Sequence, residues 1–293
     1  MNKFLFLLTL LSICFVGIEA QNTYPLPDVP SSLKEPGDRA NYLVSHFWEK
    51  APLAKINLNE DESLLEQSFV DFLSVIPYAD IDHRKLGINF LMDNTFENRP
   101  VFDFLFGLAE KYLYQEDSPM RNDDIYAIFI ANLIANPQLS DSEKLRPQFQ
   151  LEAIEKNHPG QKANDFKFQL IDGSSLSLYD IKSDNDILLM FYDPDCDHCR
   201  DTIDSLISNQ GFMDYVKNGN LKVVAIYSGD DKMLWEETYS SLPSEWLVGY
   251  EDGTLQDEDL YIIRSLPSVY LLDKDKIVKV KEMGSENICM IAK

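Results

Sequence analysis

The stretch Phe191–Thr202 reads FYDPDCDHCRDT and places Cys196 and Cys199 three positions apart. The continuous apolar run Ile187–Tyr192 comes just before the cysteines and predicts a buried central strand. Residues Cys196–Asn209 carry their apolar side chains on one helical face and predict a helix. The cysteines therefore stand between a buried strand and a helix. Three interpretations follow: a redox pair, two ligands of a metal, or a structural disulfide.

The start of the predicted helix favours the redox interpretation. A helix N-terminus presents unpaired N–H groups and a partial positive charge, which stabilise a thiolate on Cys196. Cys199 follows one turn later, close enough to resolve a mixed disulfide. His198, when protonated, would add to this stabilisation. Five neighbouring aspartates would oppose it, and they form either a solvated acidic face or a surface that selects partners: Asp193, Asp195, Asp197, Asp201 and Asp204.

Residues 1–20 have the pattern of a secretory signal peptide. Lys3 gives a positive start, Phe4–Ile18 is nearly all apolar, and Ala20 is a small residue suited to cleavage. Cys14 leaves a lipoprotein signal as the alternative. No later segment reaches about 18 uninterrupted apolar residues, so we expect no membrane span in the mature chain.

Charge and cysteine usage narrow the function further. The formal net charge of -23 argues against binding to nucleic acid or anionic membranes. An exported chain would keep three cysteines, Cys196, Cys199 and Cys289, and an odd number is a poor disulfide framework. A metal site would use Cys196, His198 and Cys199, but a fourth ligand is not evident. We therefore expect no metal and no cofactor.

The chain divides into segments with different patterns. We expect a tether at 21–36, an all-α domain at 37–158 and an α/β domain at 159–293. Tyr42, Phe47 and Trp48 are expected to be buried in the first helix. The further helices are predicted at 62–76, 83–93, 99–114, 123–135 and 141–157, with Pro147 kinking or splitting the last.

The α/β domain is predicted from alternating and continuous apolar runs. Strands are expected at 166–170, 187–192, 221–227, 268–272 and 277–280, and helices at 196–209 and 231–240.

The segments ILLMFYDPDCDHC and SLPSVYLLD resemble the thioredoxin superfamily, and within it the exported TlpA/ResA-like thiol–disulfide oxidoreductases of the AhpC/TSA type. The resemblance covers about 163–282 and implies a thioredoxin-like α/β fold. It also implies that Pro267 is a cis-proline facing the redox pair, which shapes the substrate groove and keeps metal off the cysteines. The segments PGDRANYLVSHFWEK and AEKYLYQEDSPMRND resemble a helical domain of unknown function in envelope proteins of Bacteroides-like bacteria, which implies a periplasmic location.

The sequence departs from the family at several positions. The usual tryptophan before the first cysteine is Asp195, and the buried acid six residues before that cysteine is replaced by Met190. The family ends in a helix that covers the sheet, whereas residues 283–293 allow only a short helix or none. Cys289, in this tail, is expected to be an incidental thiol rather than a third redox cysteine.

The leading hypothesis is a periplasmic dithiol–disulfide oxidoreductase that reduces disulfides of envelope proteins. Its partners would be protein disulfide substrates and, as electron donor, a membrane redox protein. One alternative is an envelope interaction module whose binding is switched by the redox pair without turnover. A thiol peroxidase is the other, although its signature of a proline and then a threonine or serine is missing: Leu189 and Tyr192 stand seven residues before Cys196 and Cys199.

Overall fold

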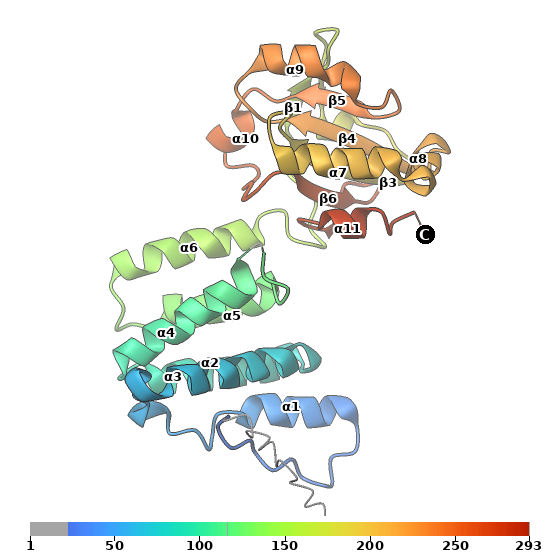
Figure 1. Ribbon diagram of the computed structural model, residues 1–293. Coiled ribbons are helices and arrows are strands. Elements are labelled where there is room, and N and C mark those ends of the chain that lie inside the picture. The colour runs from blue at the N-terminus through green and yellow to red at the C-terminus, as the bar shows by residue number, and fades with distance from the viewer. Residues whose placement is uncertain (1–22, 116, 293) are drawn as a thin grey trace, which may run out of the picture. The chain divides into compact units, whose positions relative to one another are not determined.

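The computed structural model describes residues 23–115 and 117–292 and forms two compact units, the second beginning at Leu145 (Figure 1). This boundary falls inside helix α6 (Asp141–Glu155). The C-terminal end of α6 belongs to the second unit, because the Lys281 ammonium donates to its main-chain carbonyls, including that of Ala153 at 2.6 Å.

The first unit is helical, as predicted, and each of the six expected helices is present. Asn57, Asp80 and Asn122 cap three of them by accepting a backbone N–H of the first turn. The bounds are α1 Pro36–His46, η1 Leu53–Lys55, α2 Leu58–Val75, η2 Ile76–Tyr78, α3 Ile81–Thr95, α4 Arg99–Ala109, the π-helical η3 Glu110–Tyr114, α5 Asp123–Ala135 and α6.

Three details of the helical prediction are corrected. Tyr42 is only half-buried, and the buried Phe47 and Trp48 follow α1 rather than belong to it. Helix α6 is not split at Pro147, because this proline is buried and its packing offsets the missing hydrogen bond. The predicted tether is also not free along its length, since Tyr24 is buried and its N–H donates to Ser68 Oγ at 3.1 Å.

The second unit contains one seven-stranded mixed sheet in the order β2-β1-β5-β4-β3-β6-β7. The central strand β3 (Asp186–Tyr192) runs parallel to β4 and antiparallel to β6. Its side chains are buried on both faces of the sheet, which explains the continuous apolar run. The other strands are β1 Lys167–Gln169, β2 Ser175–Ser177, β4 Leu221–Tyr227, β5 Leu247–Tyr250, β6 Ser268–Leu272 and β7 Val278–Val280.

Short helices complete the second unit, and their apolar faces cover the sheet (Figure 1). On the face that carries α7, the residues Leu206, Phe212 and Trp235 join β3 and β4 in one core cluster. The bounds are η4 Leu178–Asp180, α7 Asp197–Ser208, α8 Gln210–Lys217, α9 Lys232–Thr238, η5 Tyr239–Ser241, α10 Thr254–Asp257 and α11 Ser285–Ile288.

The closing element of the sheet is the four-residue helix α11. Ile288 at its end is fully buried in the same cluster as Leu206, and Met283 and Ile291 pack against that cluster. Of the two predicted alternatives, the short helix is therefore the one observed. Burial of these aliphatic side chains stabilises the short helix against the sheet.

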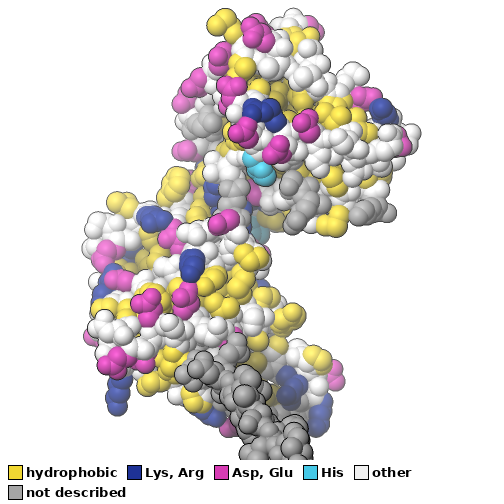
Figure 2. Space-filling view, viewed as in Figure 1, with side chains coloured by type: hydrophobic (Ala, Val, Ile, Leu, Met, Phe, Trp, Pro, Cys, Tyr) yellow, Lys and Arg dark blue, Asp and Glu magenta, His cyan; other side chains and the backbone are white. Residues whose placement is uncertain are grey.

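Acidic side chains are spread over the visible face of both units (Figure 2). Within residues 23–115 and 117–292, none of the helices has the length and apolar character needed to cross a membrane.

Candidate active site

Cys196 lies at the junction between β3 and α7, where its backbone serves as the N-cap of the helix. The Cys196 sulfur accepts the backbone N–H of Cys199 at 3.3 Å. The Cys196 N–H in turn donates to the Asp193 carbonyl at 3.1 Å, which fixes the turn before the helix. Cys196 is half-buried, so its sulfur can be reached from solvent while it receives a helix N–H donor.

Cys199 differs sharply from Cys196 because it is fully buried. Burial raises the pKa of the Cys199 thiol to about 12, and its hydrogen bond with Cys196 acts in the same direction. The backbone N–H of Asp193 bonds to Cys199 and acts in the opposite direction. All three cysteines of the described residues are free. The pair thus combines one accessible sulfur with one that is held protonated.

Pro267 lies in a loop that contacts Cys196, the placement that the resemblance implies. The Leu266–Pro267 bond is cis, and the Leu266 carbonyl lies 3.6 Å from the Cys196 sulfur, within reach of its S–H. Strand β6 starts at the next residue and pairs with β3. The structure therefore brings Cys196, Cys199 and the Pro267 loop together.

The Pro267 loop is held by an ion pair that the sequence did not indicate. The Arg264 guanidinium makes two bonds to the Glu282 carboxylate, at 3.0 and 2.5 Å, and both side chains are mostly buried. Glu282 adopts a φ of 52°, in the left-handed region that non-glycine residues rarely enter. The following residue, Met283, donates its N–H to Val269 at 2.8 Å. No local pattern links residues this far apart, so sequence alone offered no signal.

His198 and the neighbouring aspartates lie mostly outside the core. His198, Asp195 and Asp197 are exposed, whereas Asp193 is half-buried. Arg200, which sequence reasoning missed, pairs with Asp197 and donates to the Pro194 carbonyl at 2.7 Å. Arg200 is therefore a cation that contacts this turn directly.

Two further positions bear on the thiols. Met190 is fully buried in the cluster that contains Cys199, so the acid that the family has there is replaced by an apolar side chain. Cys289 is half-buried and packs against the same cluster, as Cys196 does. Its role stays a prediction.

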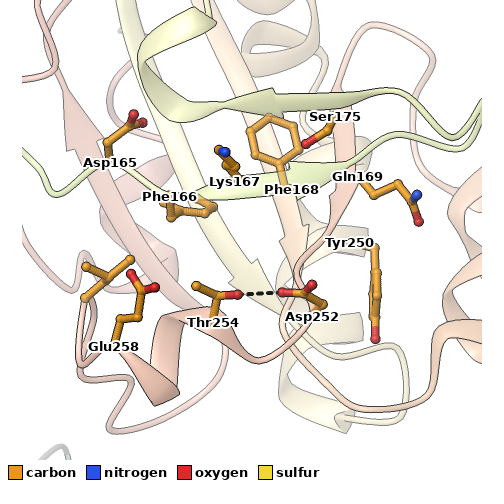
Figure 3. Close-up of a pocket in the computed structure, with 11 residues that line it drawn as sticks. Asp165, Phe166, Lys167, Phe168, Gln169, Ser175, Tyr250, Asp252, Thr254 and Glu258 are labelled. Atoms are coloured by element: carbon orange, nitrogen blue, oxygen red, sulfur yellow. Dashed lines mark hydrogen bonds between the residues drawn. The ribbon is translucent and has the colours of Figure 1, made fainter.

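Two other features of the structure bear on ligand binding, the arrangement of metal-ligating side chains and a cavity. Across the described parts of the chain, no group of three or more His, Cys, Asp or Glu residues is arranged to hold a metal ion. A cavity of about 480 Å³ opens beside β1 and the end of β5, and Tyr250, Asp252 and Thr254 lie on one side of it (Figure 3). Its lining contains no thiol, so it is separate from the redox pair.

Comparison with known proteins agrees with this geometry. Residues 12–157 match a domain of unknown function, DUF5106, and residues 159–281 match the AhpC/TSA family. A thioredoxin-like protein from Bacteroides caccae is 31% identical, with a TM-score of 0.84, over 92% of this chain and 97% of that one. The chain belongs to the thioredoxin-like proteins.

A second similar structure relates to one part of this thioredoxin-like protein. It is a conserved protein of unknown function from Bacteroides fragilis, 32% identical, with a TM-score of 0.44, over 46% of this chain and 99% of that one. None of the curated proteins matches the chain. The predicted family and the predicted fold, a helical domain followed by a thioredoxin-like α/β domain, are thus confirmed.

Proposed function

We propose that this thioredoxin-like protein is an exported dithiol–disulfide oxidoreductase. The observation that carries the proposal is the asymmetry of the two thiols. Cys196 is accessible, receives a helix N–H at 3.3 Å and faces the Pro267 loop. Cys199 is buried directly behind it. An outer nucleophile with an inner resolving thiol is what two-step disulfide exchange requires.

The proposed reaction has two steps. The Cys196 thiolate attacks one sulfur of a substrate disulfide, forms a mixed disulfide and releases the other substrate sulfur as a thiolate. Cys199 then loses its proton and attacks the Cys196 sulfur, which frees the second substrate sulfur. The substrate gains two electrons and two protons as a dithiol, and the enzyme is left with a Cys196–Cys199 disulfide. A dithiol donor must then reduce this disulfide before the next cycle.

Location and partners belong to the same proposal. The signal-peptide pattern at residues 1–20, which lie outside the described residues, supports export to a periplasm. The full-length similar structure comes from Bacteroides, a Gram-negative host with such a compartment. The substrates would be disulfides of envelope proteins, and a membrane redox protein would supply the electrons.

The test is a reduction potential measured together with turnover. We expect the purified mature protein to show a two-electron transition near the value of thioredoxin, about -270 mV. We also expect Cys196→Ser to abolish reduction of a disulfide substrate, while the matched variant Cys289→Ser keeps it. Full turnover by Cys196→Ser contradicts the proposal.

The alternatives predict different results in the same assays. A redox-switched interaction module shows the redox transition but does not turn over any disulfide substrate. A thiol peroxidase consumes hydrogen peroxide at a rate that depends on the reduced cysteines.

A further inference from the structure

The second step of the proposed reaction requires Cys199 to lose a proton. Its thiol is fully buried, and its pKa is raised to about 12, so it is protonated at neutral pH. A thiol is a poor nucleophile compared with a thiolate, so a nearby group must accept this proton. The buried acid that performs this task in related proteins is replaced by Met190, which cannot accept a proton.

Asp193 contacts both cysteines through its backbone. Its backbone N–H bonds to Cys199, and its carbonyl accepts the Cys196 N–H at 3.1 Å. Its carboxylate is held in place because Oδ1 accepts the N–H of Asp195 at 2.8 Å. Asp193 as a whole is half-buried, so it is partly open to solvent. Besides burial, the charge of the Asp193 carboxylate raises the pKa of Cys199, which indicates that this charge lies close to the buried thiol.

The other titratable groups around Asp193 are poorer acceptors. Among the described residues the buried Tyr192 hydroxyl has no hydrogen-bond partner, and burial raises its pKa, so it stays a neutral phenol. Burial raises the pKa of Tyr227 as well. The Cys196 sulfur is bonded to the substrate sulfur during this step, so it cannot accept the proton. Asp195 also carries a carboxylate, but its side chain is exposed.

We propose that the Asp193 carboxylate accepts the proton of Cys199 when Cys199 resolves the mixed disulfide. The inference rests on the proposed dithiol–disulfide function. The Cys199 S–H bond breaks, its proton moves to Asp193, and its electron pair forms the Cys196–Cys199 bond. The bond from Cys196 to the substrate sulfur breaks, and the departing sulfur carries the negative charge. Asp193 afterwards returns the proton to the leaving thiolate or to water.

The experiment isolates this step with a chemical disulfide, 5,5′-dithiobis(2-nitrobenzoate). The mature chain carries Cys289→Ala, so that only two thiols react. Attack by Cys196 releases one coloured thionitrobenzoate, and attack by Cys199 on the resulting mixed disulfide releases a second. Stopped-flow absorbance separates the two phases between pH 6 and pH 9. The variants are Asp193→Asn, whose side-chain oxygen can still accept the Asp195 N–H, and Asp195→Asn, which removes the same charge two residues away.

We expect Asp193→Asn to slow the second phase at pH 7 by about 100-fold or more, because a positioned base typically contributes about 10²–10⁴-fold. The deficit should shrink as the pH rises, because hydroxide replaces the missing acceptor. The first phase of Asp193→Asn and both phases of Asp195→Asn should stay close to the parent. A second variant, Asp193→Ala, should regain second-phase rate with added formate but not with chloride.

The outcomes separate this inference from the function on which it rests. A second phase as fast in Asp193→Asn as in the parent at pH 7 contradicts the role of Asp193 alone. Equal slowing by Asp195→Asn, or equal effects of formate and chloride, does the same, because either points to a general effect of charge. A parent protein that releases no thionitrobenzoate in two phases contradicts the proposed function, and the role of Asp193 falls with it.

Discussion

The ion pair between Arg264 and Glu282 gives a quantitative test of how the Pro267 loop is held. The two side chains are 16% and 11% exposed, and they make two bonds at 3.0 and 2.5 Å. Glu282→Gln keeps the size of the side chain but removes the negative charge that contacts the Arg264 guanidinium. Leu266 follows Arg264 by two residues, and its carbonyl faces the Cys196 sulfur. We therefore expect that loosening the ion pair also frees this carbonyl.

The burial of the pair sets the expected magnitude. Removing one partner of a fully buried ion pair costs about 3–5 kcal/mol, whereas exposed pairs contribute about 0–1 kcal/mol. The low exposure of both partners places Glu282→Gln nearer the buried limit, at about 2–3 kcal/mol. A loss of that size lowers the melting temperature of a domain this large by roughly 4–12 °C. The double variant Arg264→Met/Glu282→Gln should recover part of the loss, since it removes the mostly buried positive charge as well as the negative one.

The assay is thermal unfolding of the reduced protein, combined with the alkylation rate of Cys196 by iodoacetamide. The matched control is Lys279→Met on the neighbouring strand β7. It breaks a 2.7 Å pair with Asp186 whose side chains are 48% and 31% exposed, and it should cost less than about 1 kcal/mol. We expect faster alkylation of Cys196 in Glu282→Gln and no change in Lys279→Met. If both variants melt at the same temperature and alkylate at the same rate, the ion pair does not hold the loop.

Three further predictions concern the closing helix, the buried thiol and the acidic surface. Ile288→Ala should lower the free energy of unfolding by about 2–4 kcal/mol, measured by urea unfolding, because it empties a fully buried site. Burial raises the pKa of Cys199 from 9.0 to about 12, so this thiol ionises at lower pH in the unfolded chain than in the folded one. The stability of the reduced protein should therefore fall as the pH rises from about 9 to about 12. Cys199→Ala should flatten this part of the curve of stability against pH. The net charge of -23 should make the rate constant for reducing a lysine-rich disulfide peptide fall as salt is added, by roughly tenfold at low ionic strength, with no such fall for an uncharged peptide.

The parts of the fold that sequence could predict are those determined by local pattern. The run Ile187–Tyr192, the two cysteines and the face of α7 lie within one short stretch, so their arrangement follows from periodicity and helix capping. Strand β5 was missed because its four residues, Leu247–Tyr250, are too few to show a period. Helix α11 was left open for the same reason, since burial of Ile288 rather than its length makes it effective.

The parts of the site that sequence could not predict depend on burial and on distant contacts. Asp193 reads as one of five aspartates on a solvated face, and only the fold shows that it is half-buried with backbone contacts to both cysteines. The bond between Arg264 and Glu282 joins residues with no spacing that marks them as partners. The contact of Arg200 could not be predicted either, because its bond to the Pro194 carbonyl depends on the conformation of the turn before α7.

The contacts of the Cys196 sulfur also bear on the direction of electron flow. Strongly oxidising members of this fold class owe their potential to a reduced form that is stabilised. Here the Cys196 sulfur receives one N–H, from Cys199, and faces one carbonyl, from Leu266. Because the described residues give this sulfur one N–H donor, we expect a potential nearer that of thioredoxin, about -270 mV, than that of a strong oxidant, about -120 mV, in line with the proposal that the pair reduces its substrates.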